Sequence, residues 1–311
     1  MARVFVTRTL PGDALDRIPA AGHELDVWEQ RTPPPRAQLI ARARAADALL
    51  CTLTDPIDGP LLDACPRLRV VANYGVGVDN IDLAAAAARG VPVGNTPGVL
   101  TDATADLAFA LLLAAARRLP QTAAAVRRGE WGTWEPDGFL GHDVAGATLG
   151  IVGAGRIGRA VARRAAAFGM EELTATSRGG TPLPELLARS DFVSLHVPLT
   201  AATRHLIDGA ALARMKPTAI LVNTARGPVV DTDALVAALH AGAIAGAALD
   251  VTDPEPLPPD HPLLSAPNAL VVPHIGSATP RTRAAMADLA VDNVLAGLAG
   301  EPLPHPVAPP R

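Results

Sequence analysis

Three side chains suited to acid–base and anion chemistry each come a few residues after a short apolar stretch that predicts a buried strand. Arg226 follows the first of these stretches, Glu255 lies in an Asp-Pro-Glu-Pro turn after the second, and His274 follows the third. Parallel strands of one sheet end at the same edge, so we expect the three side chains to converge. A guanidinium holds a carboxylate through two hydrogen bonds, and a histidine exchanges protons at physiological pH. A carboxylate beside that histidine would fix its tautomer, although each residue by itself is more often structural or solvated.

A glycine-rich turn supplies the second part of the predicted chemistry. The run 149–152 predicts a strand, Gly153, Gly155 and Gly158 complete G-x-G-x-x-G, and the run 159–168 predicts a helix. In a dinucleotide site the first glycine permits the turn, the second admits the pyrophosphate, and the third lets helix and strand pack. An ordinary glycine-rich loop is the alternative, but strand and helix both lie where the motif needs them. With the three side chains above, the turn predicts reduction of a 2-oxo acid: hydride from the cofactor, a proton from the histidine, and anchoring by the arginine.

Strand and helix signals alternate along most of the chain, which predicts parallel sheets covered by helices. Predicted strands cover 3–7, 25–28, 48–52, 68–73, 91–95, 149–152, 173–176, 191–197, 219–223, 245–251 and 269–272. Predicted helices cover 10–21, 36–46, 59–64, 83–89, 101–119, 122–128, 159–168, 233–240 and 280–299, and the proline-rich residues 302–311 predict a surface tail. The sequence therefore predicts an α/β protein with two doubly wound parallel-sheet domains. A Rossmann dinucleotide-binding domain, 99–279, is inserted into a flavodoxin-like substrate domain, 1–98 and 280–311.

The predicted helix 101–119 is apolar nearly all round, so we expect it to be buried. Trp131 and Trp134 follow it in a predicted loop. Large rings in a loop often belong to an interface, and a small local core is the alternative.

The composition excludes several classes of function. The chain has 311 residues, 49% of them hydrophobic and 19% charged, with a net charge of −4 and no basic block, so we expect neither nucleic acid nor a membrane as a partner. The apolar stretch 103–116 contains Asp106 and is too short to span a bilayer. Cys51 and Cys65 predict core residues in a cytoplasmic protein rather than a disulfide framework. The histidines lack paired ligand spacing, so no metal site is expected.

Four segments of the chain together resemble a known family. They are the glycine turn Gly153–Gly158, Asn223-Thr-Ala-Arg-Gly227, the run Gly246–Pro256 that ends in Asp-Pro-Glu-Pro, and Pro273-His-Ile-Gly-Ser277. This combination resembles the D-isomer-specific 2-hydroxyacid dehydrogenases over essentially the whole chain. The segments Asn73–Asp82 and Thr101–Asp106 resemble the glyoxylate/hydroxypyruvate reductase branch most.

The resemblance implies a role for each site residue. Arg226 would anchor the substrate, His274 would be the acid/base and Glu255 its partner. The amides of Val76 and Gly77 would bind the substrate carboxylate, with Leu53 and Ser277 as further substrate contacts. Asp250 would hold the nicotinamide amide. Cofactor contacts are also implied at Gly153, Gly155, Arg156, Ile157, Gly158, Thr104, His196, Pro198, Thr203, Thr224, His274 and Gly276. The family forms homodimers through the cofactor domain, which would involve the helix 101–119 and the tryptophan loop.

Two features near Arg178 bear on the cofactor. Enzymes of this fold that prefer NAD carry an acidic residue about 20 positions beyond the third glycine, whereas this chain has Ser177 and Arg178 there. A hydroxyl and a cation suit a 2′-phosphate, so we favour NADP(H), with NAD(H) as the alternative because an arginine can also flank adenine. The chain is also short between Arg178 and the segment 185–190, so we expect the third strand of the cofactor sheet to be missing.

Several related functions stay open on the sequence alone. Phosphoglycerate, phenylpyruvate and phosphite dehydrogenases use the same scaffold, and so do dinucleotide-sensing corepressors. Formate dehydrogenases carry a glutamine where this chain has Glu255. The carboxylate therefore argues against formate as the substrate.

Overall fold

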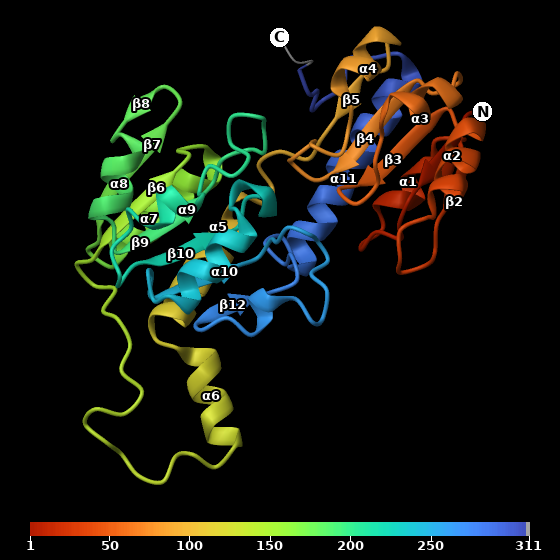
Figure 1. Cartoon of the computed structure of the whole chain (residues 1–311). Helices are drawn as coiled ribbons and strands as arrows, with labels where there is room; N and C mark the ends of the chain where they lie inside the picture. The colour runs from red at the N-terminus through yellow and green to blue at the C-terminus, as the bar shows by residue number, and fades with distance from the viewer. Residues whose placement is uncertain (309–311) are drawn as a thin grey trace. The chain divides into compact units, whose positions relative to one another are not determined.

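The chain folds into two compact units, which the computed structural model describes over residues 1–308 (Figure 1). One unit comprises Met1–Leu100 with Ser277–Arg311, and the other Thr101–Gly276. Each unit is built on one sheet of mainly parallel strands. The predicted fold class is confirmed.

The first unit has a five-stranded sheet in the order β2-β1-β3-β4-β5, with every pair parallel. This is the flavodoxin-like order predicted for the substrate domain. Its strands are β1 Arg3–Val6, β2 Glu24–Val27, β3 Ala48–Thr52, β4 Val70–Tyr74 and β5 Val93–Gly94. Its helices are α1 Arg17–Ala20, α2 Arg36–Ala45, α3 Gly59–Ala64, α4 Leu83–Ala88 and α11 Pro280–Ala299. Both cysteines lie in its core, as predicted.

The second unit has a seven-stranded sheet in the order β12-β11-β10-β9-β6-β7-β8. Its strands are β6 Thr148–Val152, β7 Glu171–Thr176, β8 Gly179–Gly180, β9 Phe192–Leu195, β10 Ile220–Asn223, β11 Gly246–Leu249 and β12 Ala269–Val271. All pairs are parallel except β7 with β8. The edge beyond β7 thus carries a two-residue antiparallel strand. The described residues contain no parallel strand there, as the short sequence after Arg178 predicts.

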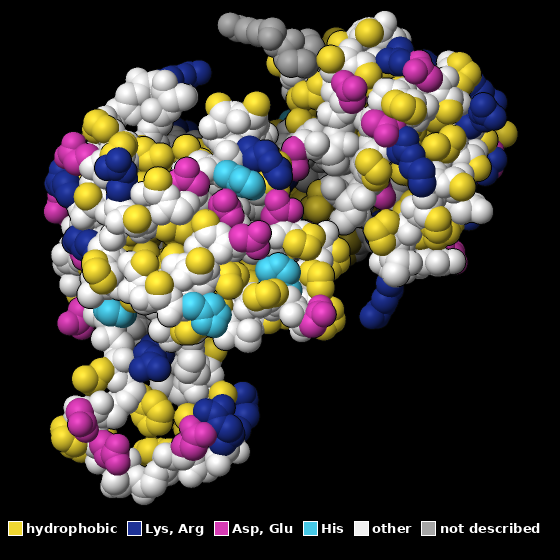
Figure 2. Space-filling model, viewed as in Figure 1, with side chains coloured by type: hydrophobic (Ala, Val, Ile, Leu, Met, Phe, Trp, Pro, Cys, Tyr) yellow, Lys and Arg dark blue, Asp and Glu magenta, His cyan; other side chains and the backbone are white. Residues whose placement is uncertain are grey.

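The predicted helices 101–119 and 122–128 correspond to α5 Thr101–Ala116 and α6 Leu119–Arg127, so the break between them lies earlier in the chain than expected. Arg118 between them has a left-handed backbone with φ 52°, and Pro120 lies in the first turn of α6. A proline lacks the N–H that a continuing helix needs, which explains the break. Beyond it, α6 and the residues that follow project from the rest of the unit and carry hydrophobic side chains on their surface (Figures 1 and 2).

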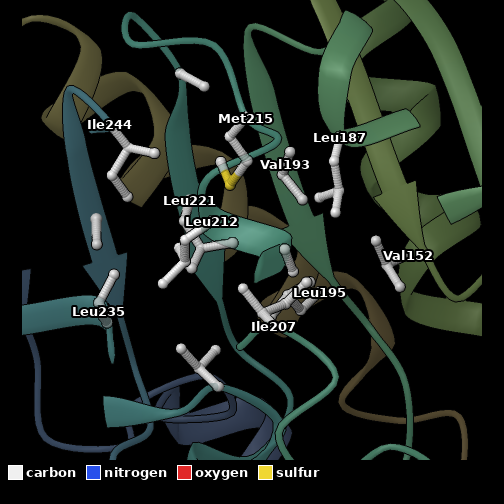
Figure 3. Packing of buried hydrophobic residues seen from close by; sticks show 14 of the residues in the cluster. Val152, Leu187, Val193, Leu195, Ile207, Leu212, Met215, Leu221, Leu235 and Ile244 are labelled. Carbon is white, nitrogen blue, oxygen red and sulfur yellow. The ribbon is translucent and has the colours of Figure 1, made fainter. Parts of the chain in front are cut away.

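Helices cover both faces of the second sheet. On one face α5 and α7 (Arg156–Ala167) pack against alternate strand residues such as Ile151 and Val222. On the other face α8 (Leu183–Arg189), α9 (Gly209–Leu212) and α10 (Thr232–His240) pack against residues of the opposite register. Figure 3 shows part of this second cluster, including Leu195, Leu221 and Met215. Because both faces of the sheet are buried, the sequence of each central strand is a nearly continuous run of apolar residues.

Two expectations for the first unit are wrong in detail. The predicted helix 10–21 is a 3-10 turn, Ala14–Asp16, followed by the short α1, and Gly12 has a φ of +86° that a helix does not allow. The predicted surface tail is packed over 303–307: Leu303 is buried, and the Val307 N–H donates to the Val93 carbonyl at 2.8 Å. The open edge of β5 offers backbone groups that this segment satisfies. Residues 309–311 of the predicted tail lie outside the described residues.

Candidate functional site

The glycine turn of the second unit has the geometry of a phosphate cradle. Gly153 has a φ of +100°, and a Cβ there would lie 2.6 Å from the His196 carbonyl oxygen. A Cβ at Gly158 would lie 2.1 Å from the Gly153 carbonyl oxygen, whereas one at Gly155 would meet nothing within 4 Å. The turn therefore needs glycine at its first and third positions for packing and leaves open space at the second.

That open space lies at the start of a long helix. Gly155 is the N-cap of α7, and Arg156 and Ile157 are its first two residues. Backbone N–H groups at a helix start have no partner within the helix and favour an anion. The residues present thus fit the pyrophosphate of a dinucleotide.

Thr104, Asp250 and Gly276 lie together near the ends of α5, β11 and β12. A Cβ at Gly276 would lie 3.0 Å from Asp250 Oδ2 and 3.3 Å from Thr104 Cγ2. Thr224, which follows β10, has a buried Oγ1 that no other described residue satisfies. Thr104, Asp250 and Gly276 are therefore close together, and Thr224 carries a hydroxyl without a hydrogen-bond partner among the described residues at the same edge of the sheet.

The structure joins two of the three predicted catalytic side chains. His274 Nδ1 lies 2.6 Å from Glu255 Oε1, and both side chains are partly exposed, at 25% and 31%. Glu255 Oε2 accepts a 3.3 Å bond from the Thr252 N–H. With its Nδ1 engaged by the carboxylate, the imidazole has Nε2 left for another partner.

Asp250 fixes the backbone that carries His274. Its two carboxylate oxygens accept the N–H groups of Ile275 at 2.6 Å and Gly276 at 2.8 Å. His274 itself has a left-handed backbone with φ 52°, and its N–H donates to the Asp250 carbonyl. Burial raises the pKa of Asp250, against the lowering effect of these amides and of His274. Sequence reasoning assigned Asp250 to the cofactor and missed this structural role.

Arg226 follows β10, the strand beside β11 in the sheet. The Asn223 side-chain amide donates to the Arg226 carbonyl at 2.9 Å, and one Arg226 guanidinium nitrogen donates to the Ala225 carbonyl at 2.8 Å. A Cβ at Gly227 would lie 1.8 Å from the Thr252 carbonyl oxygen, so the chain after Arg226 passes tightly against the turn that carries Glu255. The order β10-β11-β12 thus brings the three residues to the ends of adjacent strands.

Sequence reasoning also missed two threonines that brace this turn. Thr252 Oγ1 donates to the Pro254 carbonyl at 2.7 Å, and Thr232 Oγ1 donates to the Asp253 carbonyl at 3.0 Å. A threonine immediately before the Asp-Pro-Glu-Pro turn was a usable signal for the first, because Ser and Thr hydroxyls often bond nearby backbone. Thr232 lies on α10, far from the turn in sequence, so no local pattern indicates its role.

His196 lies at the end of β9 and is neutral at physiological pH. Burial lowers its pKa from 6.5 to about 4, and its Nε2 lies 2.9 Å from Ser194 Oγ. Beyond it, Thr203 Oγ1 donates to the Pro198 carbonyl at 2.6 Å and closes the loop. These predicted cofactor residues therefore form an ordered segment beside Gly153.

Ser177 and Arg178 form the exposed tip of the β7–β8 hairpin. Thr176 Oγ1 donates to the Gly179 carbonyl at 2.8 Å and accepts the Arg178 N–H at 3.2 Å. The tip therefore has a braced backbone while its two polar side chains face solvent.

In the first unit the predicted substrate residue Leu53 follows β3, Val76 and Gly77 follow β4, and Ser277 precedes α11. Val76 is 38% exposed in the turn after β4, Gly77 and Leu53 are half-buried, and the Ser277 carbonyl accepts the Thr279 N–H. Tyr74, the last residue of β4, is 5% exposed, and its hydroxyl donates to the Arg283 carbonyl. Tyr74 is thus a packing residue within this unit.

The two tryptophans after α6 are open to solvent. Trp131 is 63% exposed and Trp134 is 80% exposed. The alternative of a small local core around them is therefore wrong. Within residues 1–308 no helix has both the length and the apolar character needed to cross a membrane.

Comparisons with known proteins agree over nearly the full chain. Residues 109–276 match the family model described as D-isomer specific 2-hydroxyacid dehydrogenase, NAD binding domain. A glyoxylate reductase from Korarchaeum cryptofilum is 52% identical over 315 residues, which cover 97% of this chain and 95% of the relative. A crystal structure from Thermus thermophilus has a TM-score of 0.93 at 52% identity and covers 98% of this chain and 100% of its own.

A second solved structure bears on the ligands of such proteins. It is an NADPH-dependent glyoxylate/hydroxypyruvate reductase from Sinorhizobium meliloti in complex with NADP and malonate. Its TM-score is 0.86 at 37% identity, and the match covers 100% of this chain and 98% of that one.

Proposed function

Because this chain belongs to the D-isomer-specific 2-hydroxyacid dehydrogenases, we propose that it reduces glyoxylate or hydroxypyruvate to the D-2-hydroxy acid with NAD(P)H. The observation that carries the proposal is the 2.6 Å contact between His274 Nδ1 and Glu255 Oε1 at the edge that also carries the glycine cradle. Relatives near 50% identity that are named glyoxylate reductases support the choice of substrate.

The chain's own residues divide the chemistry between them. When bound, NAD(P)H supplies the hydride for the carbonyl carbon of the substrate. His274 Nε2 donates a proton to the carbonyl oxygen, so the C=O bond becomes CH–OH and the imidazole is left neutral. Glu255 holds Nδ1 and stabilises the protonated ring before the transfer. Asp250 keeps the turn below His274 in place through two backbone N–H groups.

The substrate carboxylate is assigned to the Arg226 side chain and to two backbone amides. Arg226 would hold it through its guanidinium, and the amides of Val76 and Gly77 would donate to it. Leu53 and Ser277 would complete the substrate contacts. These roles follow from the family resemblance, and the exposed turn at Val76 supports them.

We propose NADP(H) as the preferred cofactor. The exposed hydroxyl of Ser177 and guanidinium of Arg178 suit a 2′-phosphate, and no carboxylate follows β7 to take a ribose hydroxyl. We also propose the cofactor contacts that the family resemblance implies, at the residues named in the sequence analysis. The Sinorhizobium reductase, solved with NADP, supports this choice.

The assembly proposed is a homodimer that uses α5, α6 and the tryptophan segment. Four large apolar side chains of that segment are 47–80% exposed, which supports a partner surface: Trp131, Trp134, Phe139 and Leu140. The location proposed is the cytoplasm, in keeping with two buried free cysteines.

Initial rates test the proposal directly. The purified protein would receive NADPH or NADH with glyoxylate, hydroxypyruvate, pyruvate and phenylpyruvate in turn. We expect the fastest turnover with NADPH and the first two acids. Fast NADH-dependent turnover of phenylpyruvate would keep the mechanism and overturn both the substrate and the cofactor assignments. No turnover of any of the four would contradict the proposed activity.

A further inference from the structure

The turn that follows β4 has three consecutive carbonyls bound from inside the first unit. The Gly75 carbonyl accepts the Thr96 N–H at 3.0 Å. The Val76 carbonyl accepts the side-chain amide of Asn95 at 2.8 Å, and the Gly77 carbonyl accepts that of Asn73 at 2.7 Å.

Those bonds set the direction of the N–H groups. In a trans peptide the N–H points opposite to the carbonyl of the same plane. The Val76 amide shares its plane with the Gly75 carbonyl, the Gly77 amide with that of Val76, and the Val78 amide with that of Gly77. All three N–H groups are therefore turned away from the donors that hold the turn. None of the three has an acceptor among residues 1–308.

The network leaves little freedom to the two asparagines. Asn73 is fully buried, and its Oδ1 faces two donors, Cys51 Sγ at 3.5 Å and Asn80 Nδ2 at 3.4 Å. Its Nδ2 must then face the Gly77 carbonyl, because a carbonyl is an acceptor only. If the Asn73 amide were flipped, its NH₂ group would face the donors Cys51 and Asn80, and its oxygen would face the Gly77 carbonyl oxygen.

Two backbone hydrogen bonds hold Asn95 in place, one through its N–H and one through its carbonyl. Its N–H donates to the His305 carbonyl at 3.1 Å, and its carbonyl accepts the Asn293 side-chain amide at 3.0 Å. The C-terminal segment and α11 thus fix the residue whose side chain holds Val76.

We propose that Asn73 and Asn95 are positioning residues for substrate binding, which clamp the 75–77 carbonyls inward so that the amides of Val76, Gly77 and Val78 face the substrate carboxylate. The inference rests on the proposed function and deepens it in two ways. It adds the Val78 amide as a third donor. It also explains why the N–H groups of this turn are oriented before an anion binds. N–H groups that are already oriented need not be ordered when the carboxylate arrives, which favours affinity.

The test uses Asn95, which is half-buried and tolerates change better than Asn73. Asn95→Leu keeps the branched shape but removes the donor without adding charge, and Asn95→Ala removes both. A hydrogen bond to a charged group contributes roughly tenfold in affinity, so we expect about a tenfold rise in the glyoxylate KM for both variants. The kcat should stay within about twofold, because the amides hold the carboxylate in the ground state and in the transition state alike.

A binding measurement separates this inference from the proposed activity. Titration calorimetry of oxamate, a carboxylate that mimics a 2-oxo acid, into the NADPH-saturated protein requires no turnover. We expect the oxamate Kd to rise about tenfold in both variants, with the NADPH Kd unchanged. Ser265→Ala is the matched control, since it removes one exposed side-chain bond to a carbonyl, that of Pro262, in the other unit.

The outcomes are distinct. If the wild-type protein turns over glyoxylate and Asn95→Leu keeps wild-type oxamate affinity and KM, the clamp is wrong and the proposed function stands. A drop in kcat, NADPH affinity and thermal midpoint together would show a structural role only and would also overturn the clamp. If the wild-type protein neither turns over any 2-oxo acid nor binds oxamate, both proposals fall.

Discussion

The contact between His274 and Glu255 determines which imidazole nitrogen can serve a substrate. In the proposed mechanism a carboxylate on Nδ1 leaves Nε2 as the proton donor. The two N–H groups bound by Asp250 hold the turn at His274, whose left-handed backbone is uncommon for residues other than glycine. The site is thus built from one functional pair and one buried carboxylate that orients its backbone.

Removal of the imidazole tests the acid/base role. In His274→Ala we expect kcat to fall by roughly two to four powers of ten, the usual effect of a positioned acid or base. The NADPH Kd, measured by fluorescence titration, should not change. His240→Ala, on the exposed end of α10, is the matched control. Turnover of His274→Ala near the wild-type rate would remove His274 from the mechanism.

His196 predicts a pH dependence of stability. The unfolded chain takes up a proton near pH 6.5, whereas the folded His196 does so only near about 4, so stability is full above pH 6.5 and decreases as the pH falls. Between pH 7.5 and 5 the loss is about 2 kcal/mol at most. We expect urea midpoints of His196→Gln to lose less over this interval than those of the wild type.

The control for that experiment is His240→Gln, which changes an exposed histidine at the end of α10. It should follow the wild-type curve. Parallel curves for wild type and His196→Gln would contradict the lowered pKa of His196.

At the scale of elements, the start of α7 and the β7–β8 hairpin are the two places proposed to contact the dinucleotide. The start of α7 offers open space at Gly155, which serves any pyrophosphate. The β7–β8 hairpin stands in place of a longer crossover and exposes Ser177 and Arg178 at its tip. Discrimination between the two cofactors is therefore assigned to the hairpin and not to the glycine turn.

Arg178→Ala tests that assignment. We expect the KM for NADPH to rise by roughly tenfold, because one charge-assisted contact to a phosphate is lost. The KM for NADH should change little. Arg214→Ala, an exposed arginine in the same unit, controls for the loss of charge. Equal losses with both cofactors would contradict the proposed NADP(H) preference.

At the scale of the whole molecule, the segment from α6 to residue 143 exposes an apolar surface. It carries Leu119, Val126, Trp131 and Trp134 at 54–80% exposure, and a free surface with so many large apolar groups is unusual. A second copy of the chain, as in the proposed homodimer, would cover it.

Sedimentation velocity tests the dimer. We expect the wild-type protein to sediment as a dimer and a Trp131→Ser, Trp134→Ser double variant to shift towards monomer as its concentration is lowered. Leu264→Ser, which changes a side chain 49% exposed elsewhere in the unit, is the control and should remain dimeric. A wild-type monomer at micromolar concentration would contradict the proposal.

The sequence by itself determined the two parallel sheets, the glycine turn and the two residues that meet as Glu255 and His274. These features depend on local patterns, since apolar runs set strands, glycines set tight turns, and parallel strands end together. The tertiary structure alone decided the packing of residues 303–307 on β5, the exposure of both tryptophans, and the bonds from Asn73 and Asn95 to the turn after β4. Each of these depends on which residues distant in sequence come into contact, and the hydrogen bonds and buried area that favour such contacts leave no periodic signal along the residues.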